Sequence, residues 1–414
     1  MKNNVYPSVR FPSYSEGWTI QKFKDFSVKA GKKNSKNEKF KAYSVSNKQG
    51  LISQSEQFEG SRLDDLSKES YKLVNPNDFA YNPARINVGS IAFNSLSETV
   101  LVSSLYVVTK MSKEIDNDYI LQYIKSPIFN QEVRRNTEGS VREYLFYENF
   151  KNIRFPLPET KKEQIEIGLF FKEMDEMITL YQQELDALKQ IKQGFLQKMF
   201  PKEGDTAPAF RFKGFNEEWI KINFYENIKK VIDFRGRTPK KIGLEWSKEG
   251  YLALSALNVK KGYIDYTVDA NYGDEELYRK WMNGNELKVG QVVFTTEAPM
   301  GNVAQIPDNA GYILSQRTIA FEVNKDMITD DFLFILLSTP IVFNNLTALS
   351  SGGTAKGVSQ KSLSKLAVTI PRSINEQKII ADFFIQLNQM IKLKEQELAA
   401  LKQTKKGFLQ KMFV

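Results

Sequence analysis

The sequence predicts an α+β protein made of two copies of one unit, each copy being a globular body followed by a long helix. Two observations lead to this prediction. Residues 163–200 and 376–413 align without a gap at an offset of 213, and 23 of the 38 aligned pairs are identical. Ahead of each of these segments, short runs of β-branched and aromatic residues alternate with turn residues, which is typical of strands. Repetition of this kind indicates a duplicated architecture.

The repeat reaches beyond these two segments. The letters GFLQKMF close both copies, at residues 194–200 and 407–413. Near the start of each copy, PSVRFPSYSEGW at residues 7–18 matches PAFRFKGFNEEW at residues 208–219 with an offset of 201, so the second copy carries a net insertion of 12 residues. The segments between these anchors diverge. Each copy is therefore predicted to be a variable body followed by a nearly constant tail.

Apolar residues recur in both tails at alternating spacings of three and four, which is the a/d pattern of a coiled coil. These positions are Phe171, Met174, Ile178, Tyr181, Leu185 and Leu188 in the first copy, and Phe384, Leu387, Ile391, Lys394, Leu398 and Leu401 in the second. Lys394 is the one polar member, and we expect its aliphatic stem to pack while its ammonium group reaches water. Each tail is predicted to be one helix of about 40 residues.

Two arrangements would bury this apolar seam. Each helix could pack on its own body, or the two helices could pack on each other. The length favours the second arrangement, because a helix of roughly 60 Å outruns a body of this size. We therefore predict two globular domains separated by two long antiparallel coiled-coil helices, related by pseudo-twofold symmetry.

The bodies are predicted to contain a half-buried sheet. Strands are expected within residues 89–96, 99–109 and 291–296. An apolar helix is expected near the end of each body, at residues 118–126 and 331–339. A loop and a short strand should follow each of these helices.

The composition excludes several classes of chemistry. The chain has no Cys, which excludes disulfides and thiol chemistry, and no His, which removes the commonest general base. A zinc site without either residue would be very unusual, so no metal site is expected. No apolar run reaches the roughly 18 residues that span a bilayer, and the first residues have no apolar leader segment. We expect a cytoplasmic protein without a membrane partner.

The net charge of +9 is moderate for 414 residues and fits an ordinary basic surface. A polyanionic partner is favoured by where the cations lie, because they gather in matching places of the two bodies, in segments interpreted as loops. For any single lysine, a solvated surface group is the simpler interpretation. For the set, phosphate contacts and base contacts in nucleic acid are favoured. The candidate DNA-binding residues are Lys29, Lys32, Lys33, Lys36, Arg85, Arg134, Arg135 and Arg142 in the first body, and Arg235, Arg237, Lys240, Lys241, Lys260, Arg317 and Lys356 in the second.

The repeated heptapeptide suggests a second kind of site. Its apolar residues are expected to form a patch at the end of each helix that caps the helix pair or meets a partner subunit. The candidate partner-binding residues are Phe195, Leu196, Met199, Phe408, Leu409 and Met412.

Taken together, these features resemble the specificity (S) subunits of type I restriction-modification systems, over essentially the whole chain. The resemblance rests on the RFP and RFKGF openings, on the two tails that end in GFLQKMF, and on three segments of the second body. These segments are LKVGQVVFTTEAPMGNVA (residues 287–304), LSQRTIAF (314–321) and SGGTAKGVSQKSLSKLAVTIP (351–371). In the first body, EGSVREYLFYENF departs from the GGT…K form of the second.

The resemblance implies target recognition domains at residues 1–158 and 201–371, and spacer helices at 159–200 and 372–414. Each domain would read one half of an asymmetric bipartite site in double-stranded DNA, with the helices as a ruler. Two methyltransferase (M) subunits would bind this chain and methylate adenine N6 with S-adenosylmethionine. Restriction (R) subunits would use ATP and Mg²⁺, so that this chain itself binds no cofactor.

A catalytic role for the chain finds little support. No Asn/Asp-Pro-Pro-Tyr/Phe motif of amino-methyltransferases follows Asn75 or Asn82, and no phosphate-binding loop of the GxxxxGK[ST] type is present. Glu297 and Asp308 are scattered carboxylates rather than a nuclease site. We expect no catalytic residue. The alternative function is a coiled-coil scaffold whose basic loops bind DNA without sequence preference.

Overall fold

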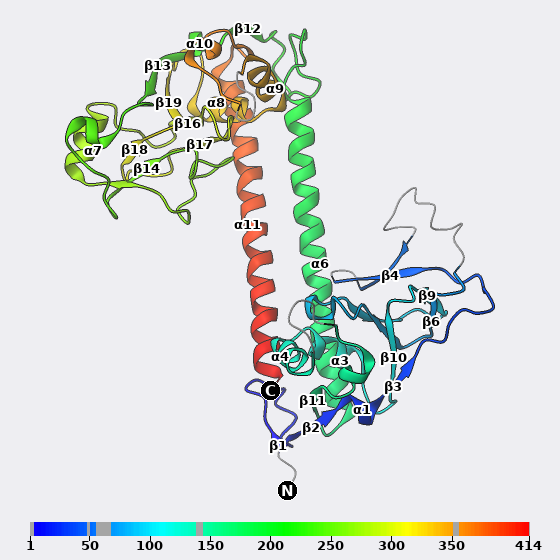
Figure 1. The fold of residues 1–414 in the computed structure, drawn as a ribbon. Helices are drawn as coiled ribbons and strands as arrows, with labels where there is room; N and C mark the ends of the chain where they lie inside the picture. Colours follow the sequence, from blue (N-terminus) through cyan, green and yellow to red (C-terminus); the bar gives the residue numbers. More distant parts are fainter. Residues whose placement is uncertain (1–3, 48–49, 55–67, 138–143, 351–355, 414) are drawn as a thin grey trace. The chain divides into compact units, whose positions relative to one another are not determined.

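The computed structural model describes residues 4–47, 50–54, 68–137, 144–350 and 356–413. The chain forms two compact units. Unit 1 comprises Met1–Gln183 and Glu395–Val414, and unit 2 comprises Glu184–Lys394. Both long helices therefore contribute residues to both units (Figure 1).

Unit 1 contains the first body. Its elements are β1 (Asn4–Val5), β2 (Trp18–Lys22), α1 (Phe23–Phe26), β3 (Ser27–Ala30), β4 (Tyr43–Ser46), β5 (Gly50–Ser53), β6 (Lys72–Val74), β7 (Asp78–Tyr81), η2 (Ile86–Val88), β8 (Ile91–Phe93), β9 (Val100–Val102), β10 (Val107–Met111), α3 (Asn117–Ile124), α4 (Pro127–Asn136), α5 (Tyr147–Phe150), β11 (Arg154–Leu157) and the start of α6 (Lys161–Lys198).

Unit 2 contains the second body. Its elements are β12 (Ile220–Asn223), η3 (Phe224–Asn227), β13 (Ile228–Asp233), η4 (Pro239–Ile242), β14 (Tyr251–Leu254), β15 (Tyr272–Gly273), α7 (Glu275–Met282), β16 (Val292–Thr295), β17 (Val303–Gln305), β18 (Tyr312–Leu314), β19 (Thr318–Val323), α8 (Asp330–Leu337), α9 (Pro340–Leu349), α10 (Gln360–Leu363), β20 (Ala367–Ile370) and the start of α11 (Ile374–Met412).

The duplication read from the sequence is repeated in the sheet topology. Unit 1 has an antiparallel sheet of order β3-β10-β7-β8, and unit 2 has the corresponding order β13-β19-β16-β17. A smaller sheet pairs β2 with β11 in unit 1 and β12 with β20 in unit 2, in both cases antiparallel. The predicted α+β fold with internal duplication is therefore confirmed.

The helical tails pair in antiparallel fashion inside each unit. In unit 1, Phe170 packs edge-on against Phe408, and Asp175 binds Lys405. In unit 2, Phe195 packs edge-on against Phe383. The two helices contain 38 and 39 residues, close to the expected length.

The seam positions behave largely as the heptad pattern predicts. Phe171, Met174 and Leu185 are buried on α6. On α11, four of the six seam residues are buried, namely Phe384, Leu387, Ile391 and Leu398. Lys394 is the polar exception in unit 2, and its Nζ lies 2.9 Å from Glu184 Oε2 with the side chain 22% exposed. The aliphatic stem thus packs while the charge is paired near the surface.

A buried charge breaks the symmetry of the seam in unit 1. Lys405 is almost fully buried, and its Nζ donates to Asp175 Oδ1 at 2.5 Å. Burial and the nearby charge of Lys125 lower the pKa of Lys405 although Asp175 opposes the shift. Burial alone would raise the pKa of Asp175, but Lys125 and Lys405 hold it below its usual value. In unit 2 the position equivalent to Asp175 is Asn388.

One helix in each body was not predicted from the sequence. The residues after α3 and α8 were predicted as loop, whereas α4 and α9 begin there. Ser126 and Thr339 cap these helices by accepting from the backbone N–H groups of Phe129 and Val342. A proline follows each cap at the first helical position, where its missing N–H costs nothing. The Ser/Thr-Pro pair therefore starts a helix here rather than a loop.

The start of each long helix is held by a three-residue clamp. In unit 1, Arg10 Nε and NH2 donate to the two carboxylate oxygens of Glu163 at 2.6 and 2.9 Å, and Trp18 Nε1 donates to Glu163 Oε1 at 3.1 Å. The carboxylate of Glu163 is 1% exposed. The hydrogen bond to Glu163 is the main cause that raises the pKa of Arg10.

Unit 2 repeats the clamp at equivalent positions. Arg211 Nε and NH2 donate to Glu376 at 2.7 and 2.8 Å, and Trp219 Nε1 donates to Glu376 Oε1 at 3.2 Å. This geometry explains why Arg and Trp recur in both openings. They join the opening segment of each body to the long helix that follows the same body. We call these two sets the Arg10 clamp and the Arg211 clamp.

Candidate nucleic-acid interface

The ends of β13 and β16 and the start of β19 lie side by side at one end of the main sheet of unit 2. Asp233, at the end of β13, pairs with Ile319, and Thr295, at the end of β16, pairs with Thr318. Because these strands are antiparallel, the ends of β13 and β16 lie beside the start of β19. We call this edge the unit 2 rim.

The rim brings together three of the predicted cations. Arg235 follows β13 by two residues, and Arg317 immediately precedes β19. Lys356 precedes Gly357, which forms a bridge with Glu297 after β16. The backbone N–H of Val358 donates to Thr296 O at 2.9 Å, which fastens this segment to the rim.

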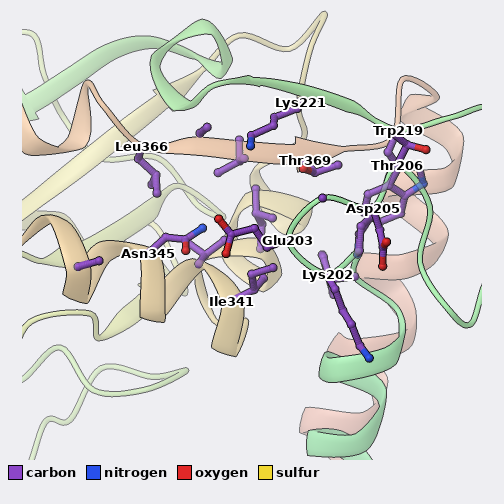
Figure 2. A pocket seen from close by; sticks show the side chains of 18 of the residues that line it. Lys202, Glu203, Asp205, Thr206, Trp219, Lys221, Ile341, Asn345, Leu366 and Thr369 are labelled. Atoms are coloured by element: carbon purple, nitrogen blue, oxygen red, sulfur yellow. The ribbon is translucent and has the colours of Figure 1, made fainter.

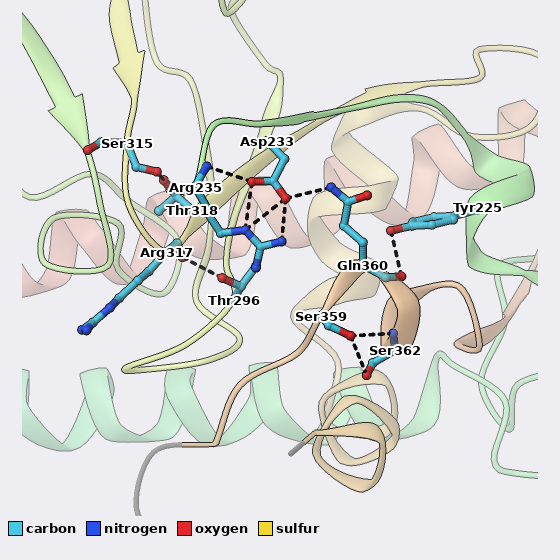
Figure 3. Close-up of polar contacts among 10 residues, drawn as sticks. All are labelled: Tyr225, Asp233, Arg235, Thr296, Ser315, Arg317, Thr318, Ser359, Gln360 and Ser362. Atoms are coloured by element: carbon cyan, nitrogen blue, oxygen red, sulfur yellow. Dashed lines mark hydrogen bonds and ion pairs between the residues drawn. The ribbon is translucent and has the colours of Figure 1, made fainter. Parts of the chain in front are cut away.

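Arg235 is not a free cation. Its Nε donates to Asp233 Oδ1 at 2.9 Å and its NH2 to Oδ2 at 2.5 Å, while Gln360 Nε2 donates to the same Oδ2 at 2.7 Å (Figure 3). Burial alone would raise the pKa of Asp233, but the hydrogen bonds from Arg235 and Gln360 lower it below its usual value. The charge of the Arg235 guanidinium is thus balanced by the Asp233 carboxylate, and the same carboxylate holds the Gln360 amide at the rim.

Arg317 is the more available cation of the unit 2 rim. Its side chain is 52% exposed, and its Nε lies 3.4 Å from Glu297 Oε1. Figure 3 shows this side chain directed away from the Asp233 network. The residue has a left-handed backbone with φ of 63°, which is costly for a residue with a Cβ. Thr296 supports this conformation, because its N–H and hydroxyl both donate to Arg317 O, at 2.8 and 3.2 Å.

The remaining cations of unit 2 lie in neighbouring loops. Arg237 donates from NH1 to Trp281 O at 3.0 Å and lies over the Phe234 ring, so its role in packing is evident. Lys241 Nζ donates to Gly236 O at 2.8 Å, whereas Lys240 is exposed on η4. Lys260 lies in a turn whose neighbour Val259 accepts from Asn302 of the β16–β17 hairpin. Arg237, Lys240 and Lys241 thus lie in the segment after β13, and Lys260 lies in the segment after β14.

Unit 1 has an equivalent rim, at the ends of β3 and β7 and the start of β10. Ala30 pairs with Val108, and Tyr81 pairs with Val107. The backbone N–H of Leu145 donates to Pro83 O at 3.0 Å, which is the counterpart of the Val358–Thr296 bond at an offset of 213. The same edge of the same sheet is therefore built twice.

Lysines of the first body gather at the unit 1 rim. Lys29 lies on β3, so the lysine-rich run, which was predicted as a loop, includes one strand of the main sheet. Lys33 pairs with Lys72 in an isolated bridge. Burial, together with the charges of Lys29 and Lys33, lowers the pKa of Lys72. Lys72 was not predicted, because its pairing with a segment 39 residues earlier has no local sequence signal.

The other candidates of unit 1 are dispersed. Lys32 and Lys36 are exposed after β3, and Arg85 is exposed after β7. Arg134 and Arg135 belong to α4, where Arg135 shares Glu132 with Arg154 of the small sheet. Arg135 is thus tied through Glu132 to the small sheet and not to the strands that form the rim. Arg142 lies outside the described residues.

Unit 2 contains a cleft at the position of the Glu132 cluster. The cleft of about 350 Å³ lies between α9, β20 and residues 200–206 (Figure 2). The residues that correspond to Glu132, Arg135 and Arg154 at an offset of 213 are Asn345, Ala348 and Ala367, and all three line the cleft. Two alanines and a shorter amide at these positions leave room for the cleft in unit 2.

The predicted partner-binding patch requires a correction. Leu196 and Met199 are buried in the core of unit 2, and Leu409 and Met412 are buried in the core of unit 1. Phe195 and Phe408 pack against the same two cores. The heptapeptide therefore seals each body onto the end of the opposite helix copy and does not present an exposed docking surface.

Two further observations concern metal sites and membrane-spanning helices. Among the described residues, no group of three or more His, Cys, Asp or Glu side chains is placed to hold a metal ion. Within the same part of the chain, no single helix is long and apolar enough to cross a bilayer, and only the bent pair α8 and α9 passes by length and composition.

A family profile decides the relationship to known proteins. The profile described as type I restriction modification DNA specificity domain matches residues 15–190 and, a second time, residues 197–403. The chain belongs to this family. The two matches fall on the two copies of the repeat, and the resemblance seen in the sequence is thereby confirmed.

Two proteins that are named as specificity subunits are similar in sequence to this chain. The chain is 24% identical over 352 residues to the type I restriction enzyme MjaVIII specificity subunit of Methanocaldococcus jannaschii, covering 81% of this chain and 78% of that protein. It is 22% identical over 316 residues to the putative MjaX specificity subunit of the same organism, covering 73% and 66%.

Two solved structures show the same fold. One is a crystal structure of a type I restriction-modification S subunit from M. genitalium, with a TM-score of 0.62 at 11% identity and 99% coverage of both chains. The other comes from a structural study of complex assembly and conformational transition of the type I R-M system, with a TM-score of 0.55 at 14% identity, covering 95% of this chain and 97% of that chain.

Proposed function

We propose that this chain is the DNA-binding specificity subunit of a type I restriction-modification complex, and that each body reads one half of an asymmetric bipartite site in double-stranded DNA. The observation that carries the proposal is the duplicated rim. Both units build the same sheet edge with the same backbone bond, at Pro83 and Thr296, and both surround it with cations. The rim side chains differ between the units, so the two half-sites should differ.

The chemistry of each rim fits this role. Lys29, Lys33 and Lys72 provide closely spaced charges for the phosphate backbone in unit 1. In unit 2, Arg317 offers a guanidinium that can donate to guanine O6 and N7. Gln360 is held by Asp233 in one orientation, which suits readout of a base edge. Residues 1–158 and 201–371 would then be the target recognition domains.

Catalysis is assigned to partner subunits in this proposal. Two methyltransferase subunits would carry S-adenosylmethionine and methylate adenine, and restriction subunits would bind ATP and Mg²⁺. This chain would bind no cofactor and would act in the cytoplasm, where the DNA is. The relatives' names as specificity subunits support a non-catalytic role for this chain.

Salt-dependent binding to DNA tests the proposal. The chain assembled with its methyltransferase subunits should prefer one split sequence, and the affinity should fall steeply with salt. Lys33→Ala should weaken binding to all sequences and reduce the salt slope by about 1, whereas Arg317→Ala should cost about 1–3 kcal/mol at one base position. Lys202→Ala, an exposed lysine of unit 2 away from the rim, is the matched control. Equilibrium binding at several salt concentrations is measured for the unaltered chain and for the three variants.

The alternative function, a coiled-coil scaffold with non-specific DNA binding, predicts a different result. In that case the affinity would depend on salt but not on sequence, and Arg317→Ala would behave as Lys33→Ala does. Equal affinity for the preferred and a scrambled duplex in the complete assembly would reject the specificity proposal.

A repeated apolar pair on the long helices is the proposed docking surface for methyltransferase subunits, in place of the buried heptapeptide. Met177 and Leu180 of α6 are 47% and 52% exposed, and Met390 and Leu393 of α11 are 53% and 60% exposed. These are the same residue types at an offset of 213. Two equivalent surfaces on one chain fit two identical partners, and their spacing of three residues fits a partner helix.

Charge substitutions on this surface should change the number of bound partners. Met177→Glu with Leu180→Glu is expected to remove one methyltransferase subunit, because two charges replace the apolar contact, and the same changes at Met390 and Leu393 should remove the other. Native mass spectrometry counts the subunits. Gln190→Glu, on an exposed turn of α6, controls for the added charge. Full occupancy by two subunits after all four substitutions would contradict this docking surface.

A further inference from the structure

Two aromatic side chains stand exposed side by side at the unit 1 rim. Tyr144 is 38% exposed and Phe146 is 55% exposed. Their ring planes are within 6° of parallel, and their centroids are 5.9 Å apart. Leu145, between them, is buried, and its N–H donates to Pro83 O at 3.0 Å. The backbone is therefore fixed at the end of β7 while both rings face outward.

The surroundings of the ring pair are basic and partly apolar. Arg85 is exposed two residues after Pro83. Leu105, which precedes β10 at the same rim, is 77% exposed. Lys72 Nζ donates to Tyr106 O at 2.5 Å, which places that charge beside Leu105. Cations around exposed rings suit a polyanion that also offers apolar groups, and DNA meets this description with its phosphates and its base edges.

Unit 2 serves as an internal comparison. The residues that correspond to Tyr144 and Phe146 at an offset of 213 are Gly357 and Ser359, while the buried residue between them is Val358, equivalent to Leu145. A role in folding would favour apolar residues at all three positions of both copies. The duplicated fold keeps only the buried one, so the two rings serve a purpose that differs between the bodies.

We propose, on the basis of the proposed function, that Tyr144 and Phe146 form an apolar platform that contacts thymine methyl groups in the half-site read by unit 1.

A base clasped between the rings would require planes about 7 Å apart, twice the stacking rise of about 3.4 Å. The rings are closer than this, so an unstacked base does not fit between them. Apolar contact with the thymine methyl group in the major groove requires no distortion of the duplex.

The test combines a change in the protein with a change in the DNA. The full chain, assembled with its methyltransferase subunits, is measured on its preferred duplex and on duplexes in which single thymines of the unit 1 half-site are replaced by deoxyuridine. This replacement removes only the methyl group. At the contacted thymine, affinity of the unaltered chain should fall about fourfold, as expected for one buried methyl group. The variant Tyr144→Ala with Phe146→Ala should bind both duplexes within about twofold of each other, because the methyl group has lost its partner.

Controls separate this contact from a loss of folding. Tyr144→Phe and Phe146→Leu keep an apolar surface and should keep the sensitivity to deoxyuridine. Tyr6→Ala removes a comparably exposed aromatic side chain of unit 1, 60% exposed, and should also leave that sensitivity unchanged.

The outcomes distinguish this proposal from the proposed function. The platform proposal would be wrong if the half-site for unit 1 contained no thymine. It would also be wrong if the unaltered chain and the double variant were equally sensitive to deoxyuridine. In both cases the proposed specificity function would still hold. No sequence preference in the unaltered complex would instead reject the specificity function itself.

Discussion

Glu163→Ala is expected to lower the free energy of unfolding of unit 1 by about 3 kcal/mol, because removing one partner of a buried ion pair leaves the other charge uncompensated. The substitution deprives Arg10 of both hydrogen bonds to the carboxylate and leaves Trp18 Nε1 without its acceptor. Trp18 is completely buried, so water cannot replace that acceptor cheaply. Denaturant unfolding followed by hydrogen exchange and mass spectrometry measures the loss in each unit.

The repeat provides the matched controls for this clamp. Glu376→Ala should destabilise unit 2 by a similar amount, since the Arg211 clamp has the same bonds. Glu163→Gln should cost less, because an amide oxygen still accepts from Trp18. Glu173→Ala, at an exposed position of the same helix, should change stability by less than about 0.5 kcal/mol. A loss for Glu163→Ala no larger than that for Glu173→Ala would refute the role of the clamp.

Exchange of one body is expected to change one half-site completely and leave the other unchanged. Residues 221–365 contain the unit 2 rim but none of the Arg211 clamp. Replacing them with the corresponding body of another family member keeps Arg211, Trp219, Glu376 and the helix pairing of both units. Since the rim of unit 1 is built only from residues of the first body, its half-site should be retained.

The sequence was informative where the chain repeats itself. The heptad spacing identified the buried seam residues Phe171 and Phe384, because a helix pair imposes its period directly on the sequence. The expected strands at β8, β10 and β16 were found for a similar reason, since a buried strand requires a short apolar run. The fold class could therefore be predicted from local patterns and internal identity.

The features that depend on distant pairing were not predictable. Lys72 reaches Lys33, which follows β3, through an isolated bridge, and Gln360 reaches Asp233 across more than a hundred residues. The clamp joins Arg10 to Glu163, and repetition revealed these residues without revealing their contact. The role of the heptapeptide was predicted wrongly, because repeated apolar residues at a helix end are expected both in a buried core and on a docking surface. Burial decides between these two, and burial is a property of the fold.

We propose that two differing bodies read two half-sites of one DNA sequence. The most direct test maps methylated adenines by methylation-aware sequencing in cells that carry the complete system, first with the unaltered chain and then with residues 221–365 exchanged. We predict one asymmetric, split sequence for the unaltered chain, and a sequence changed in only one half for the exchanged chain. Methylation without a split sequence, or a change in both halves after the exchange, would contradict the account.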